Sequence, residues 1–135
     1  MSVDEYIDQA KVRREAGDFP EAALLYEQAA AISEAADDRT RSLHSLRHAA
    51  EIQLHAGNVE RAQQHIQIVL RHYREQMPVR LEMANALRVG GLAAEAAGDF
   101  AQGRQLWGEA REIYAELKID AGVTEADRRI AAMAA

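Results

Sequence analysis

Three stretches of the sequence share one motif: Ala16-Gly17-Asp18-Phe19, Ala56-Gly57-Asn58-Val59 and Ala97-Gly98-Asp99-Phe100. Their glycines are 40 and 41 residues apart. Self-similarity at a fixed period of this size indicates a repeat architecture, in which each unit stacks on the next. Glycine takes a positive φ angle without strain, so each motif predicts a helix that ends in a tight turn before a second helix begins.

Residue size around the three glycines also repeats. Small residues recur seven positions before and five positions after each glycine: Ala10, Ala50, Gly91, Ala22, Ala62 and Gly103. Large residues recur nine positions after it: Tyr26, Ile66 and Trp107. The small residues let the two helices of a pair approach closely, and the large ones fill the space between pairs. The polar residue after each glycine can accept hydrogen bonds from the first amides of the second helix.

The composition favours helices along the whole chain. Its 135 residues suffice for one domain with a continuous core, and only Pro20 and Pro78 interrupt a sequence rich in good helix formers. No run alternates with period two, so we expect no strands. We predict helices at about residues 3–16, 20–35, 38–56, 59–75, 78–97 and 101–117. A seventh, at about 122–133, would cap the last helix pair, whose apolar face otherwise meets water.

The repeated pattern resembles the tetratricopeptide repeat family, and the resemblance covers nearly the whole chain. The family's small residue twelve positions after the glycine also has its counterparts: Ala29, Val69 and Ala110. The resemblance implies an all-α, right-handed α-α superhelix, with repeats at about 3–36, 38–76 and 78–117. Six or seven residues more than the usual 34 precede each later repeat. The additional residues are predicted to lengthen the first helices of the later repeats, because a helix can begin after Asp37 or Asp38 and at Pro78. Such longer repeats are similar to those of kinesin light chains.

In this family the first helix of each pair lines the concave surface where ligands commonly bind, which implies a protein–protein interaction module or scaffold for a peptide or helix. The candidate partner-binding residues are Lys11, Arg14, His44, Arg47, His48, Glu51, His55, Asn85, Arg88 and Leu92. The Lys and Asn pattern that some members use to clamp a terminal carboxylate is not reproduced. Arg47 and Arg88 occupy equivalent positions and suit an acidic peptide. The alternative is that both are ordinary solvated arginines.

All five histidines lie in the middle repeat: His44, His48, His55, His65 and His72. Four residues are spaced to share one helical face: His44, His48, Glu51 and His55. A histidine pair at i, i+4 can chelate a metal ion, but a zinc site needs further ligands and a supporting shell, and no HExxH pattern exists. We therefore predict no metal and no cofactor. Contacts with a partner, plain solvation and a pH-sensing role near neutrality stay open for these histidines.

The net charge, the lack of cysteine and the absence of catalytic motifs exclude several classes of function. A net charge of −6 disfavours nucleic acid as a partner, and the lack of cysteine excludes a cysteine nucleophile. No catalytic serine grouping or phosphate-binding loop is present, so we predict that the chain is not an enzyme. The start of the chain lacks a signal-peptide pattern and no apolar run reaches the roughly 20 residues of a membrane span, so we expect a cytoplasmic protein. A second hypothesis is a structural unit that self-assembles into a homodimer or larger homo-oligomer.

Overall fold

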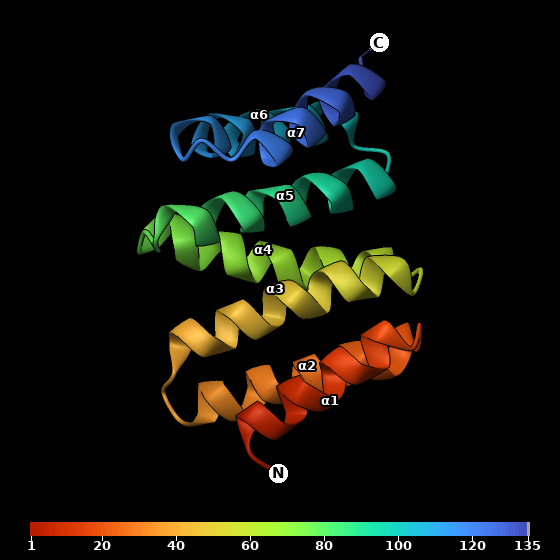
Figure 1. Ribbon diagram of the computed structural model, residues 1–135, viewed down its shortest axis with the longest axis vertical. Coiled ribbons are helices and arrows are strands. Elements are labelled where there is room, and N and C mark those ends of the chain that lie inside the picture. The colour runs from red at the N-terminus through yellow and green to blue at the C-terminus, as the bar shows by residue number, and fades with distance from the viewer. Residues whose placement is uncertain (135) are drawn as a thin grey trace. The chain divides into compact units, whose positions relative to one another are not determined.

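The computed structural model describes residues 1–134, which form seven α-helices and no strand (Figure 1). The helices are α1 (Val3–Glu15), α2 (Phe19–Ala35), α3 (Arg39–His55), α4 (Val59–Glu75), α5 (Arg80–Ala96), α6 (Phe100–Glu116) and α7 (Asp120–Ala132). Each predicted helix is present, and its ends lie within two residues of the prediction.

The three glycine turns have the conformation that the motif predicts. Gly17, Gly57 and Gly98 have φ angles of 79°, 84° and 80°, which side chains with a Cβ rarely adopt. Asp18 and Asp99 are the N-cap residues of α2 and α6. Their carboxylates accept hydrogen bonds from the backbone N–H of the third helical residue, at 3.4 and 3.2 Å. Turn and cap together end one helix and start the next.

The lengthened first helices begin in two different ways. Asp38 caps α3 by accepting a hydrogen bond from the backbone N–H of Arg41 at 3.2 Å, as predicted. The expectation that Pro78 begins the fifth helix is wrong, because α5 starts at Arg80. The intervening Val79 has φ −57° and ψ 147°, an extended conformation that separates Pro78 from the helix, and it offers no side-chain cap.

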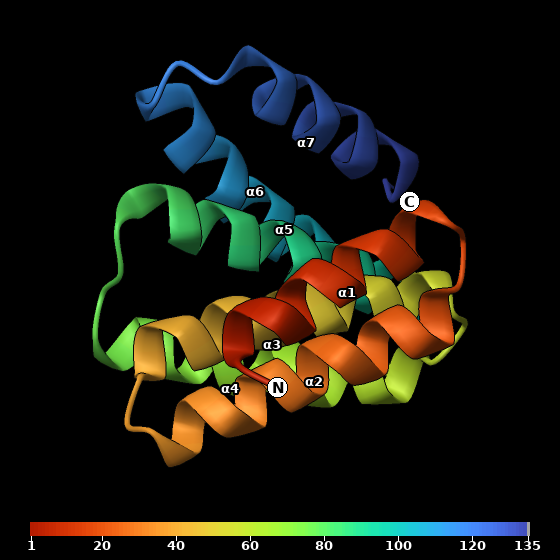
Figure 2. The same cartoon turned by 60° about the horizontal axis from the view of Figure 1, so that its bottom comes forward.

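The chain packs as two compact units that divide within α4. Unit 1, Met1–Ile66, contains α1, α2, α3 and the first half of α4. In this unit α1 packs against α2, and α2 packs against α3 (Figure 2). Its core is rich in alanine, which permits close helix contact: Ala10, Ala22, Ala23, Leu25, Tyr26, Ala49 and Ile52.

Unit 2 runs from Gln67 to the end of the chain and contains the second half of α4 with α5, α6 and α7. Here α5 packs against α6, and α6 packs against α7. Trp107 is fully buried and contacts a core with Ala126 and Met133, which confirms its predicted role in packing. A Cβ at Gly91 would lie 2.7 Å from the Trp107 ring, so only glycine allows this approach of α5 to α6.

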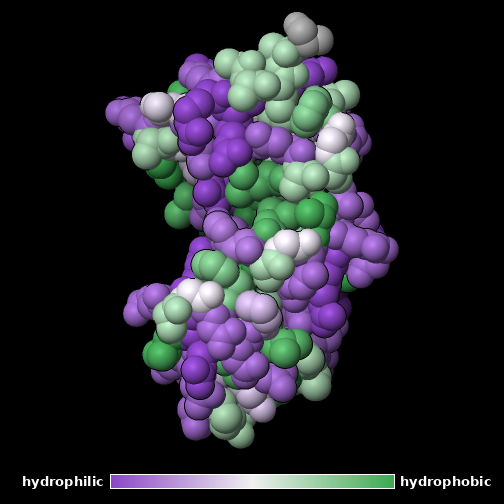
Figure 3. All heavy atoms as spheres, turned by 90° about the vertical axis from the view of Figure 1, so that its right-hand side faces the viewer, coloured by the Kyte–Doolittle hydropathy of each residue, from purple (hydrophilic) through white to green (hydrophobic). Residues whose placement is uncertain are grey.

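The surface carries mixed chemistry. On the face shown in Figure 3, hydrophilic side chains predominate and hydrophobic ones gather in smaller patches. Within residues 1–134, no helix combines the length and the apolar character that crossing a membrane requires.

Candidate partner-binding face

Six side chains of unit 1 form a cluster where α1, α2 and α3 meet. The His48 ring stacks on Tyr26, with 5.1 Å between ring centroids, and the His44 ring meets His48 edge-on at 4.7 Å. Arg14 Nη2 lies 3.8 Å from a carboxylate oxygen of Glu51. The members of this α3 cluster are Arg14, Tyr26, His44, Arg47, His48 and Glu51. Five of them are predicted site residues, which the fold therefore brings together.

Arg47 is the least usual member of the α3 cluster, because a buried guanidinium normally has a carboxylate partner. Only 7% of the residue is exposed, and its Nε is buried without a hydrogen-bond acceptor. Its Nη2 lies 3.5 Å from Nε2 of His48, a long contact. Within the part of the chain that the structure describes, Arg47 forms no ion pair. Among residues 1–134, this buried positive charge thus has no ion-pair partner.

His48 is held in its neutral form. Burial, and then the neighbouring Arg47, His44 and Arg14, lower the pKa of His48 to about 3. Its Nδ1 is buried without a partner. Because an arginine only donates hydrogen bonds, the contact with Arg47 favours the tautomer in which Nε2 of His48 accepts and Nδ1 carries the proton of the neutral ring. His48 therefore does not change charge near neutral pH.

Tyr26 belongs to the α3 cluster although the sequence pattern predicted only a packing role. Burial raises the pKa of the Tyr26 phenol, and the charges of Arg14 and Arg47 partly offset this rise. The hydroxyl group is therefore protonated at neutral pH, within the electrostatic influence of Arg14 and Arg47. In the repeat alignment its counterparts are Ile66 and Trp107, so the hydrophobic pattern alone gave no sign of this contact.

The other two predicted residues of unit 1 are exposed. Lys11 is exposed on α1. His55 is exposed at the end of α3, where its ring stacks on Phe19 with 5.1 Å between centroids. The histidines do not gather into a metal site: in residues 1–134 no group of three or more His, Cys, Asp or Glu side chains is arranged to hold an ion.

In unit 2 the predicted residues contact their own unit. The Arg88 guanidinium donates two hydrogen bonds to Glu125 of α7, at 2.7 and 3.3 Å. Asn85 Oδ1 accepts a hydrogen bond from the Tyr114 hydroxyl at 2.7 Å. Leu92 packs against the Trp107 core. Arg47 and Arg88 thus occupy equivalent repeat positions but differ in partners, since Arg88 has a carboxylate from its own chain.

A second polar network, absent from the sequence predictions, surrounds Glu27 on α2. Its carboxylate accepts two hydrogen bonds from Arg61 at 2.8 Å each, one from Gln53 at 3.2 Å, and contacts the His65 ring. Burial raises the pKa of Glu27, but these hydrogen bonds outweigh burial and lower it overall. The spacing of Arg61 and His65, four residues apart on one helical face, is the signal that could have indicated it.

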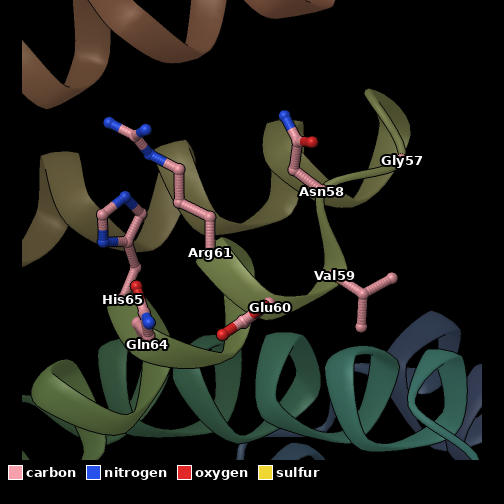
Figure 4. Close-up of a pocket in the computed structure, with 7 residues that line it drawn as sticks. All are labelled: Gly57, Asn58, Val59, Glu60, Arg61, Gln64 and His65. Carbon is pink, nitrogen blue, oxygen red and sulfur yellow. The ribbon is translucent and has the colours of Figure 1, made fainter.

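A surface cavity of about 740 Å³ lies beside this network at the start of α4 (Figure 4). Its lining residues are Gly57, Asn58, Val59, Glu60, Arg61, Gln64 and His65. Arg61 and His65 are both bound to Glu27, and Asn58 donates a hydrogen bond to Gln53 at 2.8 Å. The strongest polar groups of the cavity are therefore engaged within unit 1, and we do not regard it as the binding site.

Comparison with known proteins supports the fold. No protein-family model and no curated protein sequence matches the chain. Among solved structures, the TPR domain of Sgt2 from Aspergillus fumigatus is similar, with a TM-score of 0.70 and 17% sequence identity. The match covers 95% of this chain and 78% of that one. The chain thus has an all-α helical-repeat fold like that of tetratricopeptide repeat domains, which confirms the predicted fold class.

Proposed function

We propose that the chain is a protein-interaction module, and that the α1 and α3 face of unit 1 binds an acidic segment of a partner protein. The observation that carries this proposal is Arg47, a buried guanidinium that has no carboxylate partner among the residues that the structure describes. The fold supports the general class, because tetratricopeptide-like folds are known for protein interaction rather than catalysis. An acidic segment would supply the charge that Arg47 lacks.

The proposed face consists of the α3 cluster together with the exposed Lys11 of α1 and His55 of α3. Arg14, Arg47 and Lys11 give it positive charge on a chain whose net charge is −6, so the attraction is local. Asn85, Arg88 and Leu92 are left out of the proposed face, because their side chains already have partners within unit 2.

Peptide selection tests this function without a known partner. Random peptides displayed on phage are selected on the immobilised chain, and the enriched peptides are titrated into ¹⁵N-labelled protein. We expect enrichment of Asp and Glu, chemical-shift changes on α1 and α3, and binding at least about tenfold weaker in Arg47→Gln. Arg13→Gln is the matched control, because Arg13 is an exposed arginine on α1. Enrichment of uncharged peptides, or shifts confined to other helices, would refute the proposal.

Self-assembly is the second candidate, favoured by exposed apolar side chains near the start of α5. Met77, Val79 and Leu81 are 64%, 71% and 43% exposed. Apolar side chains that gather on a surface often mark an association site. Light scattering over a concentration series tests it: a dimer mass that Val79→Glu reduces to a monomer mass would support self-assembly. A monomer mass at every concentration would eliminate it.

A further inference from the structure

We infer that the α3 cluster is a receptor for the side-chain carboxylate of an internal Glu or Asp in the partner, with Arg47 as the group that binds it. This inference rests on the proposed function and specifies its ligand. Its basis is an excess of hydrogen-bond donors over acceptors in the cluster, taken together with the small exposed area of Arg47.

The donor excess lies on two adjacent residues of α3. Arg47 Nε–H is a buried donor without an acceptor. The Nδ1–H of neutral His48 is another, because Nε2 of that ring faces Arg47. Buried donors are nearly always satisfied in folded proteins, since leaving one unmatched is unfavourable. The cluster therefore lacks acceptors, and an arriving carboxylate has acceptor sites for about four hydrogen bonds.

The acceptors within the cluster do not satisfy these buried donors. Glu51 is the one carboxylate in the cluster, and one of its oxygens lies 3.8 Å from Nη2 of Arg14. The Tyr26 hydroxyl is protonated, so it can donate one hydrogen bond to an arriving carboxylate. Arg88, at the equivalent repeat position, shows what Arg47 lacks: its guanidinium holds both carboxylate oxygens of Glu125.

The shape of the site favours a side chain over a chain terminus. Only 7% of Arg47 is exposed, so a group that binds its guanidinium must be narrow. A carboxylate on a flexible stem of one or two methylene groups can enter while the partner's backbone stays outside. A terminal carboxylate is attached directly to the backbone and needs more room. The 3.5 Å contact between Arg47 and His48 is long enough to give way when the carboxylate arrives.

The chemical shift of the Arg47 Nε–Hε signal in a ¹⁵N-correlated spectrum measures ligand binding at this site directly. Four probes are titrated separately: N-acetyl-glutamate methylamide, the matching glutamine compound, N-acetyl-alanine and inorganic phosphate. We expect a saturable shift of the Arg47 signal with the glutamate probe, at least about tenfold tighter than with the glutamine probe. The Nε–Hε signal of exposed Arg13 in the same spectra is the internal control, and we expect it to show no saturable shift.

Other outcomes would overturn the inference. Tighter binding of N-acetyl-alanine would assign the site to a chain terminus, and tighter binding of phosphate would assign it to a phosphorylated ligand. Equal shifts with the glutamate and glutamine probes would show that the site does not distinguish a carboxylate from an amide. Tyr26→Phe keeps the ring stack, so this variant should fold and weaken glutamate binding severalfold; unchanged affinity would exclude the hydroxyl group from the receptor.

Peptide binding and binding of the glutamate probe test the proposed function and the carboxylate receptor separately. If selected peptides bind to α1 and α3 but the glutamate probe leaves the Arg47 signal unmoved, the proposed function stands and the inference is wrong. If the glutamate probe binds but no peptide does, the anion receptor stands and the interaction module is wrong.

Discussion

At the scale of single residues, Gly91 shows how the packing of unit 2 depends on a missing side chain. An added Cβ would lie 2.7 Å from the Trp107 ring, which is itself fully buried. We predict that Gly91→Ala lowers the free energy of unfolding by about 1–3 kcal/mol through overpacking. Gly108→Ala is the control, because nothing lies within 4 Å of its added Cβ. Urea denaturation should show Gly108→Ala equal to the wild type or more stable; a Gly91→Ala variant of equal stability would contradict the packing.

His48 supplies a prediction on pH. Its pKa is about 3 in the folded state, against roughly 6.5 in the unfolded chain. Between these values the unfolded state binds the proton and the folded state does not, so stability falls as the pH drops below about 6.5. His48→Phe keeps a ring on Tyr26 and removes the titration. We predict that between pH 7 and pH 5 the variant loses about 1–2 kcal/mol less stability than the wild type. Parallel pH profiles of stability would contradict this.

Some core and site residues could be predicted from the sequence, and others could not. The repeat register placed Trp107 in the core and Arg47 among the site residues. It did not place Tyr26 in the site, because its counterparts in the other repeats are apolar and its stack with His48 depends on how α2 and α3 pack. Nor did it separate Arg47 from Arg88, since the partner of Arg88 comes from α7, 37 residues further along the chain.

At the scale of helices, Glu27 joins α2, α3 and α4 within unit 1 through Gln53, Arg61 and His65. We predict that Glu27→Gln lowers stability at pH 7 by about 1.5–3 kcal/mol, because hydrogen bonds to a charged group are lost. The folded-state pKa of Glu27 is lowered, so this contribution is present above the unfolded pKa and is lost as the pH falls. Thermal denaturation of Glu27→Gln against Glu60→Gln, an exposed control on α4, measures it. Similar losses in both variants would contradict the network.

The last helix, α7, supplies an element-scale prediction for unit 2. Its Ala126 packs against Trp107, and its Glu125 binds Arg88. We predict that a chain ending at Ile119 exposes Trp107, the only tryptophan, and melts at a lower temperature. The measurement is the emission maximum of Trp107, which should move to longer wavelength in the truncated chain and stay unchanged in Arg128→Ala, a control on the exposed side of α7. An unshifted maximum after truncation would show that α7 does not cap the core.

Helix positions were predictable because glycine turns and aspartate caps act locally. Asp38 caps α3 as its sequence position indicates. Pro78 was misleading, because a proline suits a first helical turn but does not require one, and the extended ψ angle of Val79 leaves it in the loop. For α5 the local signal was insufficient, because no side chain caps the start of this helix.

At the scale of the whole molecule, repetition builds a fold and a few unrepeated side chains give it specificity. Arg47 and Arg88 occupy the same repeat position, yet one is neutralised by Glu125 and the other is not. We propose that this difference makes unit 1 the half of the chain that binds an acidic partner.

A double-mutant cycle between Arg47→Gln and the acidic residues of a selected peptide tests this claim most directly. Each Glu or Asp of the peptide is changed in turn to its amide, and isothermal titration calorimetry measures all four combinations. The account predicts that one acidic residue couples to Arg47 by about 1.5 kcal/mol or more, as close charge pairs in interfaces do. Additivity within about 0.5 kcal/mol at every acidic position would show that Arg47 does not bind the partner's carboxylate, and would contradict the account.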